Sequence, residues 1–218
     1  MEKKEFHRRH LPHFQRPGQE YFVTWCTKDA VPPKAFESYT QQLKQISNQI
    51  DNAKSRKADD KIIMELKFEF SNIRKKYMKA FDDLLHLQTK FIIDLSKDEN
   101  TQEVMNALCY WEDIRLENYA FCVMPNHVHW VFRLFEKDEN GDPVYLQDIM
   151  QSVKRFSANK INALEHKTGS VWQNESYDTT IRDNFHLYNA INYTIDNPVK
   201  AGLVKNWWEW KGTRLFLI

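Results

Sequence analysis

The alternation of apolar and polar side chains is sharpest in residues 121–134, FCVMPNHVHWVFRL. Successive side chains of a β-strand point to opposite faces of the sheet. One alternating set is uniformly apolar and comprises Val128, Trp130, Phe132 and Leu134. The other set comprises His127, His129, Val131 and Arg133. The pattern predicts a strand over His127–Phe135 with one face in the core and two histidines together on the opposite, more polar face.

Two further segments have the composition of strands. Tyr21–Thr27, YFVTWCT, is aromatic and β-branched and follows the turn-forming residues RPG. Asn118–Met124 is also apolar, and a tight Pro125-Asn126 corner joins it to the histidine strand. Strands separated by one long crossover indicate an α+β fold with a largely antiparallel sheet and helices on one face.

The middle of the chain is predicted to be helical. No glycine or proline occurs between Lys34 and Met124, and Lys, Glu, Gln, Leu and Ile are frequent there. The expected helices are Tyr39–Ile50, Lys61–Ile93 and Gln102–Trp111. We interpret residues 34–100 as a solvated helical hairpin inserted into a single domain that spans residues 1–218. A role of this hairpin in self-association or partner binding stays open.

Two amphipathic helices are expected in the C-terminal half. The first, Tyr145–Lys167, has an apolar face that is expected to point into the core and comprises Leu146, Ile149, Met150, Val153 and Phe156. Arg155 then points away and Lys154 flanks the apolar face, where both could contact DNA phosphates or simply be solvated.

The second helix, residues 184–197, starts after Asp183 and stops at Pro198. Its buried stripe is Leu187, Ile191 and Ile195. Tyr188 falls beside this stripe and is expected in the core. Tyr193 and Asn197 lie one turn apart on the far side.

Charge and cysteine content narrow the classes of protein. The net charge is +1, but Lys3, Lys4, Arg8, Arg9 and Arg16 crowd the N-terminus, so a local basic patch is compatible with the neutral total. No apolar run reaches the ~20 residues of a membrane span, and MEKKEFHRRH lacks the apolar core of a signal peptide. We expect a cytoplasmic protein without membrane contact. Cys26, Cys109 and Cys122 show no CxxC spacing and are expected to be buried thiols.

The histidine pair is the strongest chemical signal. A single histidine on a strand is usually structural, but His127 and His129 at i and i+2 can hold one ion between them. The pattern favours a metal or phosphate role, and two ligands alone do not complete a metal site.

Four segments together resemble one family. They are RRHLPHFQRPGQEYFVTWCT, YAFCVMPNHVHWVF, VWQNESYDTTIRD and INYTIDNPVKAGLV. The combination closely resembles the REP-associated tyrosine transposases of the single-tyrosine HUH superfamily, because MPNHVH is followed some sixty residues later by the tyrosine, Asn-Pro-Val and Ala-Gly-Leu-Val. The resemblance covers the first 28 residues and roughly residues 105–210, and it leaves out the helical insert.

The resemblance implies a specific chemistry. His127 and His129 would bind Mg²⁺ or Mn²⁺, and Asn197 would complete the metal site. Tyr193 would attack a phosphate of single-stranded DNA, giving a 5′-phosphotyrosine and a free 3′-OH. The expected partner is single-stranded DNA, in particular hairpin-forming repeats. Relatives occur as monomers and as dimers that exchange the tyrosine helix, so a homodimer is possible.

Several residues outside this centre are candidates for DNA contact. Arg8, Arg9 and Arg16 could follow a DNA backbone or groove. Trp172 could stack an unpaired base or could instead pack against the sheet edge, and Arg182 lies near it in the sequence. Lys154 and Arg155 complete this predicted set.

We therefore predict a ferredoxin-like (RRM-like) α+β fold with an inserted helical hairpin. Three hypotheses for the function of the protein remain open. The first is a metal-dependent transposase or nickase, an endonuclease of DNA transposition and recombination. The second is a domesticated single-stranded DNA or hairpin-binding protein with weak or lost catalysis. The third, an unrelated metal-dependent hydrolase, needs carboxylate ligands, and the histidine strand offers none before Glu136.

Overall fold

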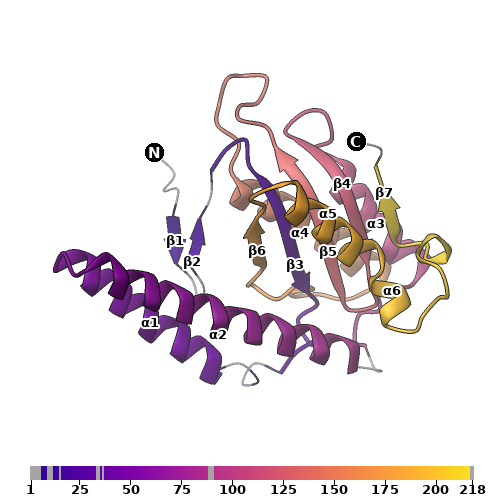
Figure 1. The fold of residues 1–218 in the computed structure, drawn as a ribbon. Helices are drawn as coiled ribbons and strands as arrows, with labels where there is room; N and C mark the ends of the chain where they lie inside the picture. The colour runs from indigo at the N-terminus through magenta and orange to yellow at the C-terminus, as the bar shows by residue number, and fades with distance from the viewer. Residues whose placement is uncertain are drawn as a thin grey trace. The chain divides into compact units, whose positions relative to one another are not determined.

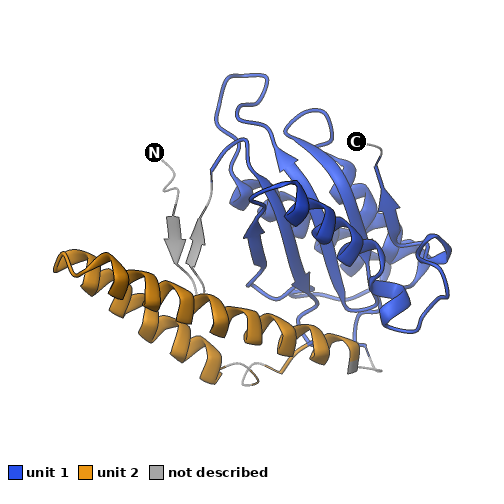
Figure 2. Ribbon diagram, viewed as in Figure 1, with its two compact units in different colours: residues 1–6, 13–30, 90–218 blue, residues 7–12, 31–89 orange. Residues whose placement is uncertain are grey.

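The structure is a computed structural model that describes residues 6–8, 12–14, 16–32, 35, 37–87 and 91–216. The chain divides into two compact units (Figure 2). Unit 1 comprises residues 1–6, 13–30 and 90–218, and unit 2 comprises residues 7–12 and 31–89. The inserted hairpin predicted over residues 34–100 falls mainly in unit 2, and residues 90–100 lie in unit 1.

A five-stranded sheet organises unit 1 (Figure 1). Its strands are β3 (Glu20–Cys26), β4 (Leu116–Val123), β5 (His127–Leu134), β6 (Tyr177–Thr180) and β7 (Thr213–Leu215). They lie in the order β6-β3-β5-β4-β7, and every neighbouring pair is antiparallel. Histidine strand β5 is therefore central, between β3 and β4.

The connections between the strands confirm the predicted α+β fold class. α3 (Asp98–Cys109) lies between β3 and β4 in the sequence, and α4 (Leu146–Leu164) lies between β5 and β6. Strands β3 to β6, with α3 and α4, thus form a β-α-β-β-α-β unit whose spatial order, β6-β3-β5-β4, is that of ferredoxin-like folds. β7 adds a fifth strand beside β4.

The apolar half of the histidine strand lies in the main core, as the alternation predicts. Val128, Trp130, Phe132 and Leu134 join residues of β3, β4, α3 and α4 in one buried cluster. The Trp130 ring meets Trp25 of β3 edge to face, with centroids 6.2 Å apart. Burying each such large side chain contributes about 1.5–3 kcal/mol to folding.

The opposite face of the sheet is also covered, which corrects the expectation of helices on one face only. α5 (Asn184–Ile195) packs there on β4 and β5. Tyr119, Val131, Ile181 and Ala190 form a second buried cluster, with Phe22, Leu187 and Ile191 packed around it. The covering helix follows from the apolar residues that β3, β4 and β5 direct to this face, which would otherwise remain in water.

The remaining elements are short or lie in unit 2. α6 (Asn197–Lys200) and the 3₁₀ helix η2 (Trp207–Glu209) follow α5, and β1 (Phe6–Arg8) pairs with β2 (Pro12–Phe14). Unit 2 contains α1 (Glu37–Ser55) and α2 (Asp60–Leu87), joined by residues 56–59 into the expected helical pair. Its buried side chains include Leu43, Ile46, Tyr77, Phe81 and Leu85. Among the described residues, no helix combines the length and apolarity that crossing a bilayer requires.

A partly buried carboxylate, Glu165, ties the end of α4 to the start of α3. Glu165 Oε1 accepts hydrogen bonds from Lys97 Nζ at 2.7 Å and from Asn100 Nδ2 at 2.8 Å. The hydrogen bond from Lys97, followed by the one from Asn100, lowers the pKa of Glu165 to about 2. Since the pKa is lower in the folded than in the unfolded chain, the ionised carboxylate stabilises the fold above pH 5, and this stabilisation is lost as the pH falls toward 2.

We expect Glu165→Gln to lower the free energy of unfolding at pH 7 by about 1–2 kcal/mol, a value discounted because the Lys97 partner is half exposed. The difference from wild type should narrow below about pH 4.5, because the carboxyl group of the unfolded chain takes up a proton there while the native carboxylate stays ionised until the pH approaches 2. Urea unfolding at pH 7 and at pH 3.5 measures both effects. Glu139→Gln, at an exposed loop position, is the matched control. A difference that stays constant with pH would contradict the assignment.

Candidate functional site

The two histidines form a directly contacting, buried pair on the face of β5 that α5 covers. His127 is 1% exposed and His129 is 0% exposed. Their Nε2 atoms are 3.0 Å apart, and the ring centroids are 4.7 Å apart with planes inclined at 82°. The predicted shared face is confirmed, and α5 covers it.

The outer nitrogen of each ring has a defined hydrogen-bond partner. His127 Nδ1 lies 2.7 Å from Asn126 Oδ1, and His129 Nδ1 lies 2.8 Å from Thr24 Oγ1. An amide oxygen can only accept, so His127 Nδ1 carries the proton and Nε2 carries the lone pair. A threonine hydroxyl can donate or accept, so it suits either tautomer of His129. These contacts fix the ring orientations in the way that outer-shell partners fix metal-bound histidines.

The short distance between His127 Nε2 and His129 Nε2 leaves room between them only for a proton or a metal ion. Two lone pairs at 3.0 Å repel each other unless a proton or a cation is shared. Two adjacent ligands of an octahedral ion, with metal–ligand bonds of about 2.1 Å, are separated by roughly 3.0 Å. The pair therefore has the spacing of adjacent ligands of an octahedral metal, and without metal a single proton can satisfy it.

Tyr193 of α5 stands beside this pair. Its ring meets His129 edge to face with centroids 5.3 Å apart, and it meets Phe22 with centroids 5.7 Å apart. Phe22 also stacks on His129, at 5.8 Å and an inclination of 17°. The imidazole and the phenol therefore share one aromatic cluster across β3, β5 and α5.

The rotation of α5 differs from the prediction. Tyr188, expected in the core, is 65% exposed, whereas Tyr193 faces the sheet. The small residues Ala190 and Thr194 are buried and allow the helix to approach the strands closely. Asp183 fixes the start of this helix, because its Oδ1 accepts from the His186 backbone N–H at 2.7 Å.

Asn197 is wholly buried at the start of α6, one turn after Tyr193. Its amide oxygen is the donor type that hard divalent ions accept. Among the described residues, no group of three His, Cys, Asp or Glu side chains is placed to hold a metal. Within the part of the chain that the structure describes, a metal on the histidine pair would therefore need a further ligand of another type.

Two of the predicted buried thiols flank the histidines. In the strand register Cys26 is opposite His127 and Cys122 is opposite His129. Burial raises the pKa of each thiol to about 12. Cys109 is half buried, and burial raises the pKa of its thiol too. All three are free cysteines, and the two on the histidine face are neutral thiols at physiological pH.

The structure places the predicted DNA-contacting residues in different settings. Arg16 and Arg182 are exposed, as contact with DNA requires. Arg9 and the Arg8 side chain lie outside the described part of the chain. Trp172 is 4% exposed, packs on Trp25 with ring centroids 6.0 Å apart, and donates to Ser157 Oγ at 3.0 Å. Of the two predicted roles, its position in the main core favours packing over stacking on a base.

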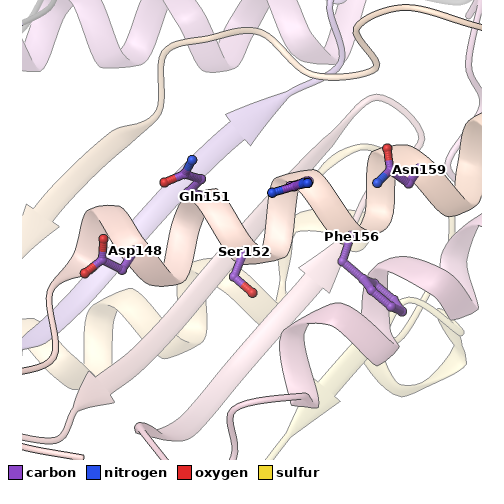
Figure 3. A pocket seen from close by; sticks show the side chains of 6 residues that line it. Asp148, Gln151, Ser152, Phe156 and Asn159 are labelled. Atoms are coloured by element: carbon purple, nitrogen blue, oxygen red, sulfur yellow. The ribbon is translucent and has the colours of Figure 1, made fainter.

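The two basic residues of α4 also differ from each other. Lys154 Nζ donates to the backbone oxygens of Gln173 at 3.0 Å and Glu175 at 3.1 Å, so it anchors the loop before β6. Arg155 is exposed and lines an open hollow of about 490 Å³ (Figure 3). The other lining residues are Asp148, Gln151, Ser152, Phe156 and Asn159. Phe156, predicted to point inward, is 40% exposed in this hollow because it lies at the edge of the helix face that meets the sheet.

Four residues of the site were not predicted from the sequence. Thr24, Phe22 and Asn126 orient or cover the histidines, and Lys200 places its ammonium 4.4 Å from the centroid of the Tyr193 ring. The period of two in Tyr21–Thr27 does place Phe22 and Thr24 on one face. Their register against His129 depends on a long-range strand pairing that this period does not specify.

The burial of the cysteines predicts their reactivity. In the native protein we expect a thiol reagent such as DTNB to modify Cys109 readily and to leave Cys26 and Cys122 unmodified, because neither is exposed or ionised. The absorbance of the released thiolate counts the reactive groups, and all three should react in denaturant. Rapid reaction of Cys26 or Cys122 in the folded protein would show that the sheet face opens to solvent.

Comparison with known proteins supports the family resemblance. No family model matches the chain. A Haemophilus influenzae protein assigned as a REP-associated tyrosine transposase is 27% identical over 106 residues, which cover 44% of this chain and 58% of that protein. A solved structure of a REP-associated tyrosine transposase bound to a REP hairpin aligns over 97% of this chain and 82% of that one, with 13% identity and a TM-score of 0.44. The matching region thus spans little more than half of the curated relative, and over that region the resemblance to the REP-associated tyrosine transposases is confirmed.

Proposed function

We propose that this chain is a metal-dependent single-stranded DNA transposase or nickase that cleaves and rejoins DNA through a 5′-phosphotyrosine at Tyr193. One observation carries the proposal: the Tyr193 ring lies against one imidazole of a buried pair whose Nε2 atoms face each other at 3.0 Å. A nucleophile and a potential cation site are thereby held in one cluster. The named relative supports the same class of activity.

Three side chains would hold the metal. His127 and His129 would offer Nε2, and Asn197 its amide oxygen. When bound, Mg²⁺ or Mn²⁺ supplies a Lewis acid that offsets charge on the phosphate oxygens and orients the phosphate. Imidazole ligands suit Mn²⁺ better than Mg²⁺, so Mn²⁺ should serve at least as well in vitro.

Tyr193 performs the covalent step in this proposal. Its hydroxyl oxygen forms a bond to the phosphorus while the bond from phosphorus to the 3′-oxygen breaks. The phenol loses its proton, and the 3′-oxygen gains one. A phosphotyrosine diester retains the energy of the DNA diester, so attack by a free 3′-OH reverses the reaction and joins strands without a nucleotide cofactor.

The neighbours of Tyr193 restrict its position. Phe22 contacts the rings of both Tyr193 and His129 and fills the space between β3 and α5. Asn126 and Thr24 hold the imidazoles, so little reorientation is needed when a phosphate arrives. Because α5 packs on the sheet of its own chain, we propose cleavage in cis. The homodimer stays a prediction.

One observation favours the alternative function, a single-stranded DNA or hairpin-binding protein with weak or lost catalysis. Both histidines are at most 1% exposed, and a phosphate has to reach the metal for catalysis. A proton shared between the Nε2 atoms would make the pair a purely structural element. The two functions differ in whether a covalent DNA adduct forms.

The first test of the proposal is the covalent adduct. Single-stranded DNA labelled at its 3′ end and incubated with Mn²⁺ should yield a labelled protein band on a denaturing gel, since the 3′ fragment keeps the 5′-phosphotyrosine. Tyr193→Phe should abolish this band and leave DNA affinity within about twofold, because only the hydroxyl is removed. Tyr188→Phe, an exposed tyrosine on the same helix, should keep it. Binding without an adduct in wild type would favour the alternative function.

Metal binding can be measured separately from catalysis. Mn²⁺ at a hundred times its Kd stabilises a one-site protein by about 2.7 kcal/mol, which for this chain length corresponds to a Tm increase of roughly 5–10 °C. We expect this increase in wild type and its loss in His127→Ala and His129→Ala. His186→Ala, outside the pair, should retain it. An equal increase in all four proteins would exclude the histidine pair as the metal site.

A further inference from the structure

The side chain of Lys200 places its positive charge beside the ring of Tyr193, the proposed nucleophile. Its ammonium lies 4.4 Å from the centroid of the Tyr193 ring, in the range of a cation–π contact. Tyr193 is partly buried, whereas Lys200 is exposed. The phenol ring thus contacts an exposed ammonium as well as the buried imidazole of His129.

The nearly helical path of the chain from α5 into α6 allows this contact, because Asp196 between them keeps a right-handed helical backbone. α5 ends at Ile195, and α6 begins at Asn197 with Pro198 in its first turn. Residues seven positions apart lie on nearly the same side of successive helical turns, and helical side chains lean toward the N-terminus. The long Lys200 side chain therefore reaches back over Tyr193.

The ammonium of Lys200 is not neutralised by the described part of the chain. Lys97 and Lys167 contact Glu165, and Lys211 contacts Asp98. Among the described residues, no carboxylate forms an ion pair with Lys200. A lysine whose full charge points over a tyrosine ring and into solvent is suited to an anionic ligand.

We propose that Lys200 is a phosphate-binding catalytic residue that contacts a non-bridging oxygen of the phosphate attacked by Tyr193. The inference rests on the proposed function. Reacting atoms meet at about 3–3.5 Å, so a phosphate engaged by the Tyr193 hydroxyl comes within reach of an ammonium that already contacts the same ring. There Lys200 offsets the charge that develops on the phosphate oxygens during attack.

A purely structural role of Lys200 would lead to different results in its variants. If Lys200 only packs on the Tyr193 ring, the contact is made by its methylene groups, and Lys200→Met preserves both DNA binding and cleavage. If it binds phosphate, Lys200→Met loses function while Lys200→Arg retains it, because arginine keeps the charge and forms good phosphate contacts. Lys205→Met, at another exposed lysine nearby, is the matched control.

The binding experiment uses Tyr193→Phe protein in EDTA, so neither cleavage nor metal contributes. The Kd for single-stranded DNA is measured over a series of salt concentrations. Loss of one phosphate contact should reduce the slope of log K against log salt by about 0.7 in Lys200→Met. Lys200→Arg should restore the slope. Equal slopes for Lys200→Met and its parent would overturn the proposal even if wild type forms no DNA adduct.

The activity experiment uses otherwise wild-type protein under single-turnover conditions with Mn²⁺. We expect Lys200→Met to slow adduct formation about 10²-fold, as loss of one charge-stabilising donor does in other active sites, and Lys200→Arg to recover most of the rate. Thermal unfolding checks that each variant folds, and Lys200→Gln replaces Lys200→Met if the latter does not. Wild-type rates in both uncharged variants would overturn the proposal. Absence of an adduct in wild type would instead refute the proposed function, and the salt dependence would still decide the role of Lys200.

Discussion

The contact between two imidazole nitrogens at 3.0 Å is the constraint on which the candidate site depends. It exists because β5 places both rings on one face and because Asn126 and Thr24 turn the inner nitrogens toward each other. Two opposed lone pairs buried in a low dielectric would be costly, but when the Thr24 hydroxyl donates to His129 Nδ1, His129 Nε2–H donates to the Nε2 lone pair of His127 and the cost is removed. The same 3.0 Å spacing, satisfied by one proton in the folded protein, also matches the separation of adjacent metal ligands on which the proposed function relies.

The helix that buries the histidine pair, α5, also carries the proposed nucleophile, Tyr193. The apolar positions beside the histidines, Val131 of β5 and Tyr119 of β4, attract α5 through ordinary hydrophobic packing. Close approach through Ala190 and Thr194 then brings Tyr193 against His129. Phe22 contacts both rings, so the position of the phenol is determined by packing across three elements. The stability of this second core and the geometry of the proposed chemistry are consequently coupled.

Local patterns predicted the elements and the face of the histidines, but not the long-range placement of their partners. The period of two in β5 depends only on neighbouring residues, and both of its faces are as predicted. The apolar stripe of α5 was also identified, since Leu187 and Ile191 pack on the sheet. The predicted rotation of α5 about its axis was wrong, since Tyr188 is exposed. The small residues Ala190 and Thr194 decide which side of α5 approaches the sheet, and such residues contribute little to a hydrophobic pattern. Trp172 was ambiguous for a related reason: an aromatic in a loop is equally suited to a core and to a base.

The exposure of the site residues indicates the direction from which DNA would arrive. His127, His129 and Asn197 are buried, whereas Tyr193 is partly exposed and Lys200 is exposed. A phosphate that approached across the sheet would have to displace Phe22 or α5 and disrupt the second core. A phosphate that approaches along the end of α5 meets the ammonium of Lys200 and the phenol of Tyr193 before it meets the imidazoles. The second path disturbs less packing and brings the negative charge to a positive one first, so the C-terminal end of α5 is the physically favoured entrance to the site.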